Sequence, residues 1–344
     1  MNGSSYNPFR VWKLLVFFGI ALACAIVPAI VHNDYLMQVF FRIVLFAALG
    51  LAWNLVGGYA GQLSLGHVAF FGVGAYGLAI FTARGVPVWI SIFLAATVAM
   101  GFAAIIGRIV FRLRGPYFTL STIAFGEVLR LGAANLNATG GAIGLSTPAL
   151  FRPRTIFEVH PVSMVQQFYL AAVVLAVVCF LINYATSKSR PGYYLMAIRE
   201  DEETAAAVGI DTAGYKLRAL LISAFLTALG GALYGSAFQY IVPDSTLSIE
   251  ISVQMAIITM LGGAGTLLGP VIGAVLLLGA SEVFKNRFQE SHLLIYGILI
   301  VVVVLFLPEG IVGGLRHLLR RGMKPKPPAS VATGPTVAQA KGGT

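Results

Sequence analysis

The densest group of ionisable residues lies near the middle of the chain, between two long apolar runs. It comprises Arg199, Glu200, Asp201, Glu202 and Glu203, and it continues through Thr204, three alanines (including Ala205) and Val208 to Gly209. Acids in a first turn and a glycine after the last turn are typical of a short helix. Alanines allow such a helix to sit closely on a partner, and charges set its register there. On charge alone, a docking helix and a plain solvated loop are equally good interpretations.

Two glycine-rich stretches of the chain resemble each other. The stretch Ala60-Gly61-Gln62-Leu63-Ser64-Leu65-Gly66 is echoed, one residue shorter, by Ala264-Gly265-Thr266-Leu267-Leu268-Gly269. Each follows a Gly-Gly pair and precedes an apolar run. Paired glycine breaks commonly mark the substrate pathway of a transporter, because unwound backbone is tolerated where it lines a cavity. Chance repetition is the alternative in a chain this rich in glycine and leucine.

The candidate residues of a translocation path follow from these breaks and from polar residues at membrane depth. They are Gly58, Gly61, Gln62, Ser64, Gly66, His67, Glu127, Gly263 and Gly265. Serine and glutamine are also ordinary hydrogen-bonding residues between membrane helices. We favour that structural interpretation for Ser64, and both interpretations stay open for Gln62 and His67.

An ionisable residue within a membrane span is by default a candidate functional residue. Glu127 has Arg130 three positions later on the same predicted helix. Residues at this spacing share a face and can form an ion pair. Arg130 also lies near the outer end of its span, where a long side chain can reach the interface. We therefore predict that these two residues form a structural pair.

The chain carries no sequence pattern of an enzyme. The phosphate-loop pattern G-x-x-x-x-G-K-[ST] is missing, and so are H-E-x-x-H and G-x-S-x-G. The histidines are scattered without metal-ligand spacing, and the two cysteines, Cys24 and Cys179, lie inside apolar runs. We expect no catalytic residue, no metal and no cofactor in this chain.

The composition indicates a protein embedded in a lipid bilayer. Of the 344 residues, 58% are hydrophobic and 10% are charged, and the mean hydropathy is +0.86. A soluble domain carries about 25% charged residues, so this chain cannot cover a water-facing surface. The net charge of +10 does not indicate nucleic acid, because the basic residues stand between apolar runs and in the tail, where they set orientation.

Apolar runs predict the membrane-inserted segments. The first, 11–31, is longer than the core of a signal peptide and is expected to stay as an uncleaved span. The others are roughly 35–56, 67–83, 87–107, 116–136, 166–186, 217–241, 251–280 and 292–308. Basic residues before the first span, after the fourth and sixth spans and in the tail place both termini in the cytoplasm.

The run 251–280 needs a special arrangement if the basic tail is to stay inside. Five residues interrupt its middle, namely Gly262, Gly263, Gly265, Gly269 and Pro270. Its flanks, 251–261 and 270–280, would each be about 16 Å long as helices, which is half a bilayer. We predict a glycine-broken hairpin that enters and returns on the outer side, or two short passes.

These segments divide the chain into regions. Residues 1–10 form a cytoplasmic N-terminus, and 11–315 form a transmembrane domain with an external loop at 137–165 and a cytoplasmic loop at 187–216. Residues 316–344 form a basic cytoplasmic tail that composition predicts to be disordered. The predicted fold is all-α, with nine or ten membrane-inserted helical segments.

Several blocks of sequence are similar to those of one transporter family. Glu203-Thr204-Ala205, three residues and Gly209 resemble the EAA-type coupling loop of ABC import permeases, and the wider block 199–216 resembles the Liv-type branch, which contains branched-chain amino-acid permeases. Further similar blocks are 57–67, 120–127, 139–146, 257–270 and 308–310. They follow the family's order over roughly residues 40–315.

The resemblance implies a function and a set of partners. In this family the coupling helix docks into a groove of an ATPase subunit, so the implied coupling residues here are Arg199, Glu200, Asp201, Glu202, Glu203, Ala205 and Gly209. The implied partners are two ATPase subunits that hold ATP and magnesium, a second permease (a sibling or a copy), a periplasmic binding protein and an amino-acid substrate. The implied location is a bacterial inner membrane.

Three alternatives stay open at this point. The substrate could be urea or a short amide, because related permeases share much of the pattern. An ion-gradient transporter would use Glu127, Arg130 or His67 as a relay. An integral-membrane enzyme would need a cluster of histidine, aspartate or cysteine at one membrane face, and the sequence offers none.

Overall fold

The protein is described by a computed structural model. It covers residues 33–288 except 114, 151–153 and 157–159, together with residues 19, 26–28, 31, 297 and 310–312. Apart from these few residues, the first predicted span (11–31), the last one (292–308), the N-terminus 1–10 and the tail 316–344 lie outside the described residues.

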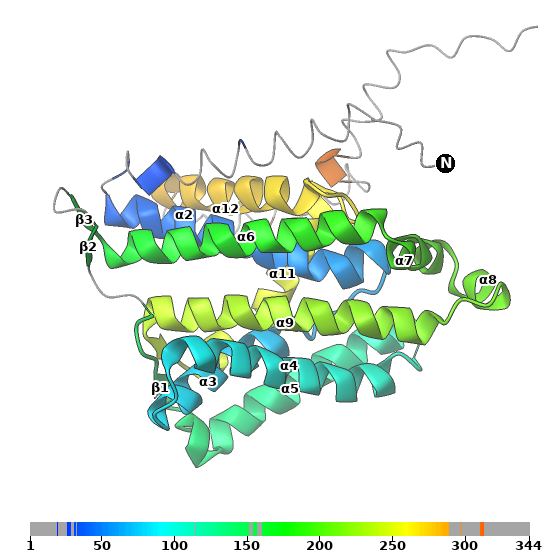
Figure 1. Cartoon of the computed structure of the whole chain (residues 1–344), viewed down its shortest axis with the longest axis horizontal. Coiled ribbons are helices and arrows are strands. Elements are labelled where there is room, and N and C mark those ends of the chain that lie inside the picture. Colours follow the sequence, from blue (N-terminus) through cyan, green and yellow to red (C-terminus); the bar gives the residue numbers. More distant parts are fainter. Residues whose placement is uncertain are drawn as a thin grey trace, which may run out of the picture.

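The described chain is a bundle of long helices that run between two ends (Figure 1). The long helices are α2 (Asp34–Trp53), α3 (His67–Ala83), α4 (Val88–Val110), α5 (Pro116–Asn135), α6 (Met164–Lys188), α9 (Thr212–Phe238), α11 (Ile249–Gly262) and α12 (Gly269–Phe288). A short π-helix, η1 (Asn54–Tyr59), extends α2. One end of the bundle carries α7 (Arg190–Glu200) and α8 (Glu202–Ala207) (Figure 1).

The opposite end carries the short irregular elements. They are η2 (Asn137–Thr139), α10 (Pro243–Thr246) and four strands, β1 (Leu145–Ser146), β2 (Arg154–Ile156), β3 (His160–Val162) and β4 (Tyr240–Ile241). Strand β1 pairs antiparallel with β4, and β2 pairs antiparallel with β3. The pair β1–β4 joins the loop after α5 to the end of α9, so segments far apart in sequence close this end together.

Local signals in the sequence set where several helices begin. The Asn33 side chain accepts hydrogen bonds from the backbone N–H groups of Tyr35 and Leu36 at the start of α2. Ser163 and Gln166 form a reciprocal capping box at the start of α6. Gly115, with φ of 54°, turns the chain into Pro116 at the first position of α5.

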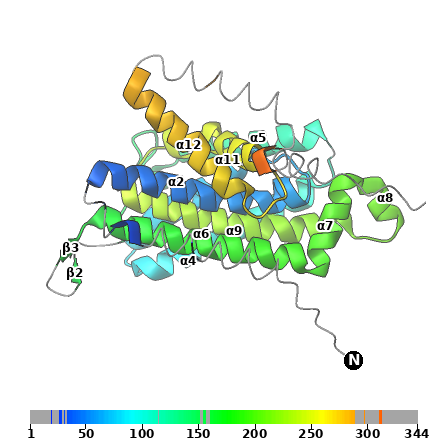
Figure 2. The same cartoon turned by 90° about the horizontal axis from the view of Figure 1, so that it is seen from above.

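Helix α9 lies at the centre of the bundle and packs against α2, α3, α4 and α6 (Figure 2). Its contact with α3 depends on small residues. A Cβ added at Gly231 would overlap the carbonyl oxygen of Phe71, and one added at Gly74 would overlap that of Ala228. Small residues that let two backbones approach are typical of membrane helix pairs.

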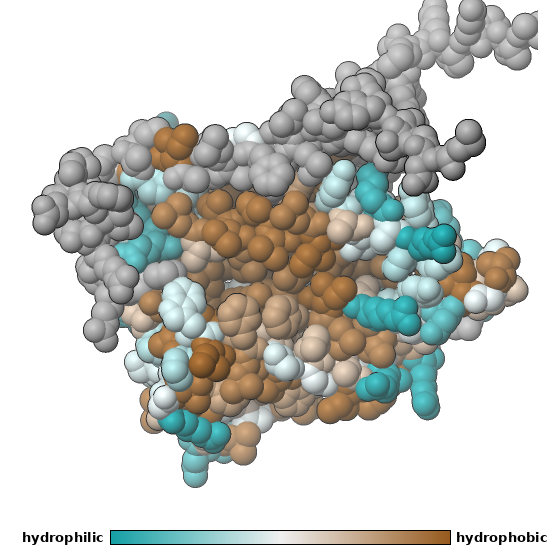
Figure 3. Space-filling view, viewed as in Figure 1, coloured by the Kyte–Doolittle hydropathy of each residue, from teal (hydrophilic) through white to brown (hydrophobic). Residues whose placement is uncertain are grey.

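The outer surface fits a bilayer. A broad hydrophobic area covers the middle of the face seen in Figure 3, and hydrophilic residues gather toward the two ends. Five described helical segments are long and apolar enough to cross a membrane, namely Asp34–Tyr59, Val88–Val110, Met164–Lys188, Thr212–Phe238 and Pro243–Gly262. The predicted all-α polytopic fold is confirmed.

The structure corrects three details of the sequence prediction. The break in 251–280 is present, but its flanking helices are longer than half a bilayer. Helix α11 has 14 residues and α12 has 20, which at 1.5 Å per residue makes α11 about 21 Å long and α12 about 30 Å long. The charged run 199–203 belongs to two helices, since Arg199 and Glu200 close α7. Short strands at the end of the bundle opposite α8, which the apolar pattern does not reveal, add to the helices.

Gly231→Ala tests the close contact between α3 and α9. We expect it to lower the free energy of unfolding by about 1–3 kcal/mol, because the added methyl group overpacks a filled interface. Thermal unfolding in detergent measures the effect. The matched control is Gly101→Ala on α4, where an added Cβ meets nothing within 4 Å. Equal melting temperatures for the two variants would contradict this account of the packing.

Candidate functional site

The first glycine break occupies residues 57–66, from the last residues of η1 to the start of α3. Gly58 lies so close to its surroundings that an added Cβ would overlap the Asn54 side chain and come within 2.6 Å of the Gly265 backbone nitrogen. Gly61 has φ of 68°, a conformation that glycine adopts most easily. From Gly61 to Gly66 the chain has no regular structure, and α3 then begins at His67.

The second glycine break separates α11 from α12. Gly263 and Gly265 have φ values of 122° and 75°. The Thr266 hydroxyl donates to the Gly263 carbonyl at 2.7 Å and accepts from the Gly269 N–H at 3.1 Å. Thr266 therefore replaces helical hydrogen bonds that the break removes.

The two breaks touch each other, and Asn54 joins them. Its Oδ1 accepts from the Gly265 N–H at 2.8 Å, and its Nδ2 donates to the Thr266 carbonyl at 3.1 Å. The same Nδ2 donates to Oδ1 of Asn183 on α6 at 3.1 Å. Both asparagines are fully buried. The sequence analysis missed Asn54 because a single polar residue in an apolar run gives no pattern.

The two glycine-rich stretches that are similar in sequence are thus also in contact in the structure. Each follows a helix, and Gly58 approaches Gly265 directly. A true internal repeat stays a prediction, because a contact does not require one. The predicted candidates Gly58, Gly263 and Gly265 lie together here.

Arg199 lies at this contact rather than on the exposed docking helix. Its Nη1 donates to the Gly58 carbonyl at 2.8 Å and to the Ala264 carbonyl at 3.3 Å. Beside it is an open hollow of about 380 Å³, whose other lining residues are Trp53, Gly57, Gly61, Leu63, Met260 and Ala264. The spacing of the charged run gave no sign that Arg199 points back into the bundle.

His67 and Ser64 are held in the core at the end of the first break. His67 is fully buried, with Nδ1 at 2.9 Å from Ser64 Oγ and Nε2 at 2.8 Å from Ser223 Oγ. Ser223 donates its own proton to the Ala52 carbonyl at 2.6 Å. It therefore accepts from Nε2–H, and this assigns the tautomer of the ring. This bonding favours a structural interpretation of both residues.

The remaining polar residues of the first break are also bonded locally. Trp53 Nε1 donates to the Ser64 carbonyl at 2.7 Å, and Thr122 Oγ1 accepts from the Leu65 N–H at 3.1 Å. Gln62 Nε2 donates to the Ala60 carbonyl at 3.3 Å, and its side chain is half-buried.

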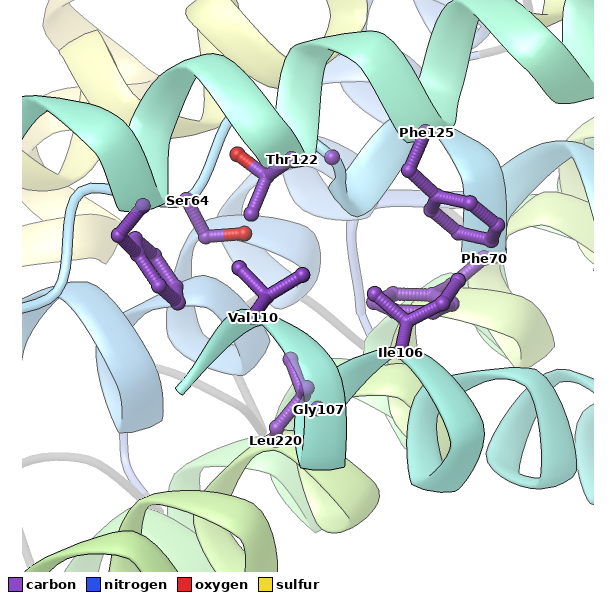
Figure 4. A pocket seen from close by; sticks show the side chains of 10 residues that line it. Ser64, Phe70, Ile106, Gly107, Val110, Thr122, Phe125 and Leu220 are labelled. Carbon is purple, nitrogen blue, oxygen red and sulfur yellow. The ribbon is translucent and has the colours of Figure 1, made fainter. Parts of the chain in front are cut away.

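Ser64 and Gly66 border a narrow cavity between this loop, α4, α5 and α9 (Figure 4). Apart from Thr122, its other walls are apolar, with Phe70, Ile106, Val110, Phe118, Phe125 and Leu220 among the lining residues. The cavity has a volume of about 10 Å³, the size of one water molecule. It is too small for an amino acid, so it is a packing seam of this conformation.

Glu127 and Arg130 form the predicted ion pair on α5, on the side of the helix that meets α10. Arg130 Nε lies 3.1 and 3.0 Å from the two carboxylate oxygens of Glu127. Arg130 also contacts Asp244 on α10, a partner that the sequence analysis did not identify. The Glu127 side chain is 49% exposed in the described chain.

The predicted docking helix is present as α8 and projects from one end of the bundle (Figures 1 and 2). The Asp201 carboxylate accepts from the Thr204 backbone N–H at 2.6 Å and caps the helix. This bond holds the pKa of Asp201 below its usual value. Gly209, with φ of 88°, ends the segment. Glu203 and Val208 are exposed, whereas Ala205 is buried.

A buried ion pair fixes α8 to the bundle. Lys216 Nζ on α9 lies 2.6 Å from Glu202 Oε1, and the Lys216 side chain is 0% exposed. The ammonium group also lies 5.3 Å from the centre of the Phe111 ring. Glu202 thus faces inward and Glu203 faces outward, which divides the acids of this run into a structural and an exposed set.

Three comparisons describe what the chain is similar to. The family model described as "Branched-chain amino acid transport system / permease component" matches residues 35–304. The high-affinity branched-chain amino acid transport system permease protein LivM of Escherichia coli is 30% identical, over 80% of this chain and 70% of that protein. The permease proteins BraD of Pseudomonas aeruginosa and LivH of E. coli are 26% and 24% identical, over 83% and 81% of this chain and 97% and 96% of those proteins.

A solved structure gives a weaker similarity. PsaBC from Streptococcus pneumoniae in complex with Fab aligns with a TM-score of 0.44 and 15% identity, over 86% of this chain and 99% of that chain. That similarity is too low to carry an argument.

Asn54→Leu tests the junction of the two breaks. We expect it to lower the free energy of unfolding by about 3 kcal/mol, because the Gly265 N–H and the Thr266 carbonyl lose their buried partner at about 1–3 kcal/mol each. Thermal unfolding in detergent is the measurement. The control, Asn135→Leu, removes a side chain that bonds only within exposed α5. A stability loss no larger than that of the control would refute the role of Asn54.

Glu202→Gln and Lys216→Met test the ion pair from its two sides. The first leaves a buried cation without its carboxylate and should cost about 3 kcal/mol. The second should cost about 1 kcal/mol, because methionine fills the apolar site and the partly exposed Glu202 can reach water. Thermal unfolding and hydrogen exchange of α8 measure both. If Lys216→Met destabilised the protein more than Glu202→Gln, the unpaired buried charge of Lys216 would not be the main cause of the stability loss.

Proposed function

Because the chain belongs to the branched-chain amino acid transport system / permease component family, we propose that it is one permease subunit of an ATP-driven importer. It is a multi-pass membrane protein and a transport component rather than a catalytic subunit. Its proposed cargo is a branched-chain or related amino acid, which crosses the inner membrane of a bacterium.

The observation that carries this proposal is the exposed helix α8 at one end of an apolar bundle. It is capped by Asp201 and fixed by Lys216, and it presents Glu203 and Val208 outward. A short rigid helix with an acidic first turn is suited to dock into a groove of an ATPase subunit. Two such subunits would hold ATP and magnesium, so this chain needs no cofactor of its own.

The distribution of basic residues supports a cytoplasmic position of the α8 end. Arg108 lies in the last turn of α4 and Arg112 follows the end of that helix, and Lys188 and Arg190 lie where α6 meets α7. All four belong to connections at the end that carries α8. Basic residues are enriched on the cytoplasmic side of membrane proteins. The opposite end, with β1–β4 and α10, would then face a periplasmic binding protein.

The second permease subunit would complete the path. In Escherichia coli the relatives include two differently named permease proteins, LivM and LivH, and the chain is similar to both. We propose that a sibling permease, rather than a second copy, pairs with this chain. Helix α5 exposes Tyr117, Leu120, Val128 and Leu131 and has an extended apolar face available for such a partner.

The paired breaks are the proposed moving part of the path. Irregular backbone at membrane depth is tolerated where it is buried in protein or borders a cavity, and the hollow beside Gly61, Met260 and Ala264 provides such a border. Binding and hydrolysis of ATP in the partners would shift this region between two arrangements and expose the amino acid to each side in turn.

Glu203→Arg tests docking of α8. Charge reversal on its exposed face should reduce uptake by at least about tenfold and reduce recovery of ATPase subunits with the purified permease, because a like charge at an interface costs several kcal/mol. The matched control is Glu250→Arg at the opposite end of the bundle, which should leave ATPase recovery unchanged. Normal uptake and normal ATPase recovery with Glu203→Arg would refute the docking role.

A further inference from the structure

Arg199 connects the docking helix to both glycine breaks. It lies in the last turn of α7, two residues before Asp201, which caps α8. Its side chain leaves α7 in the direction of the bundle and reaches the Gly58 and Ala264 carbonyls. Any displacement of α8 moves the backbone at Asp201, and that backbone continues directly into Arg199.

The chemistry of the contact suits a guanidinium group. The Gly58 carbonyl lies at the end of η1, and the Ala264 carbonyl lies just past the end of α11. Carbonyls at the ends of helices lack intrahelical partners and carry a partial negative charge. One nitrogen, Nη1, has two N–H groups and donates to both carbonyls. A single cation therefore holds the ends of two broken helices.

The fit around Arg199 is close on both sides. A Cβ added at Gly61 would come within 2.8 Å of Arg199 Cγ, and one added at Gly265 would overlap its Nη1. The glycines thus provide room for the arginine stem as well as for the unusual backbone. Helix α7 itself packs against η1, which keeps Arg199 in register with the first break.

We propose that Arg199 is a positioning residue that transmits displacement of the docking helix to the two glycine breaks. This proposal rests on the proposed function, because it requires an ATPase that moves α8. Within this chain, Arg199 bonds to the two break carbonyls. Its side chain holds the Gly58 and Ala264 carbonyls together in one arrangement. When α8 moves, the side chain either lets go of these carbonyls or moves them with it.

Arg199→Met removes the donors and the charge while keeping a long unbranched side chain. In proteoliposomes that contain the complete complex and its binding protein, we expect amino-acid uptake to fall on the order of tenfold, a typical size for coupling between sites. ATPase activity and recovery of the ATPase subunits should stay within about twofold of the wild type. Uptake per ATP hydrolysed is the decisive quantity, because a general loss of structure would lower both activities together.

The matched control is Arg190→Met at the start of the same helix, about two and a half turns away. It should leave uptake per ATP hydrolysed unchanged. Arg199→Lys should retain part of the coupling, because an ammonium group can still donate to a carbonyl. If Arg199→Met does not assemble, Arg199→Gln, which keeps an amide donor, takes its place in the same measurements.

A distance measurement separates transmission from stability. Spin labels on exposed Leu63 and Met260, one beside each break, should change their separation when the complex is trapped with ATP and vanadate. That change should disappear in Arg199→Met. The proposal would be overturned if the separation of the labels changed as much in Arg199→Met as in the wild type, or if Arg199→Met took up as much amino acid per ATP as the wild type. It would also be overturned if the separation did not change in the wild-type complex.

Failure of this proposal differs from failure of the proposed function. If the wild-type complex imports amino acid and the Arg199 variants match it, only the role of Arg199 is wrong. If the wild-type chain does not associate with ATPase subunits, or accumulates solute without them, the proposed function itself is wrong and the Arg199 proposal is overturned with it.

Discussion

The arrangement of this protein depends on one constraint, which is that backbone polar groups in a lipid environment need partners inside the protein. An unbroken helix meets this requirement by itself, and a broken helix does not. Here the chain breaks between η1 and α3 and again between α11 and α12. The structure satisfies the exposed groups by bringing the breaks together, with Asn54 bonded to the N–H of Gly265 and the carbonyl of Thr266. The positions of α2, α11 and α12 follow from that contact.

Much of the fold could be predicted because each membrane helix is marked in this chain by a continuous apolar run. The apolar run 67–83 coincides with α3, and the predicted 87–107 and 116–136 differ from α4 and α5 by at most three residues at either end. The acids and the glycine around Glu203 and Gly209 indicated a short helix, and α8 confirms it. Length, hydrophobicity and capping residues act over a few turns, so the sequence displays them directly.

The candidate site was only partly predictable, because its decisive contacts join residues with no local pattern. Asn54 is one amide in an apolar run, and its partners are at 183, 265 and 266. Lys216 looks like an ordinary charge at the start of α9, yet it is buried against Glu202. In the sequence, Arg199 forms one charged run with the acids that follow it. In the structure, Asp201 separates α7 from α8, so the Arg199 side chain and the acids of α8 point in different directions. In each case the direction of a side chain, and not its type, determines the role.

The nature of the breaks also explains why an arginine is suited to the link between docking helix and pathway. Gly58, Gly61 and Gly265 have no side chains, so a neighbour can act on these three positions only through the backbone. What the glycines offer is backbone carbonyls, and these respond to hydrogen-bond donors. A donor must extend from α7 to both carbonyls and keep its charge. The guanidinium of Arg199 meets both conditions, with one nitrogen at 2.8 and 3.3 Å from the two oxygens. The glycines that interrupt the helices thus leave two backbone carbonyls within reach of a single side chain on α7.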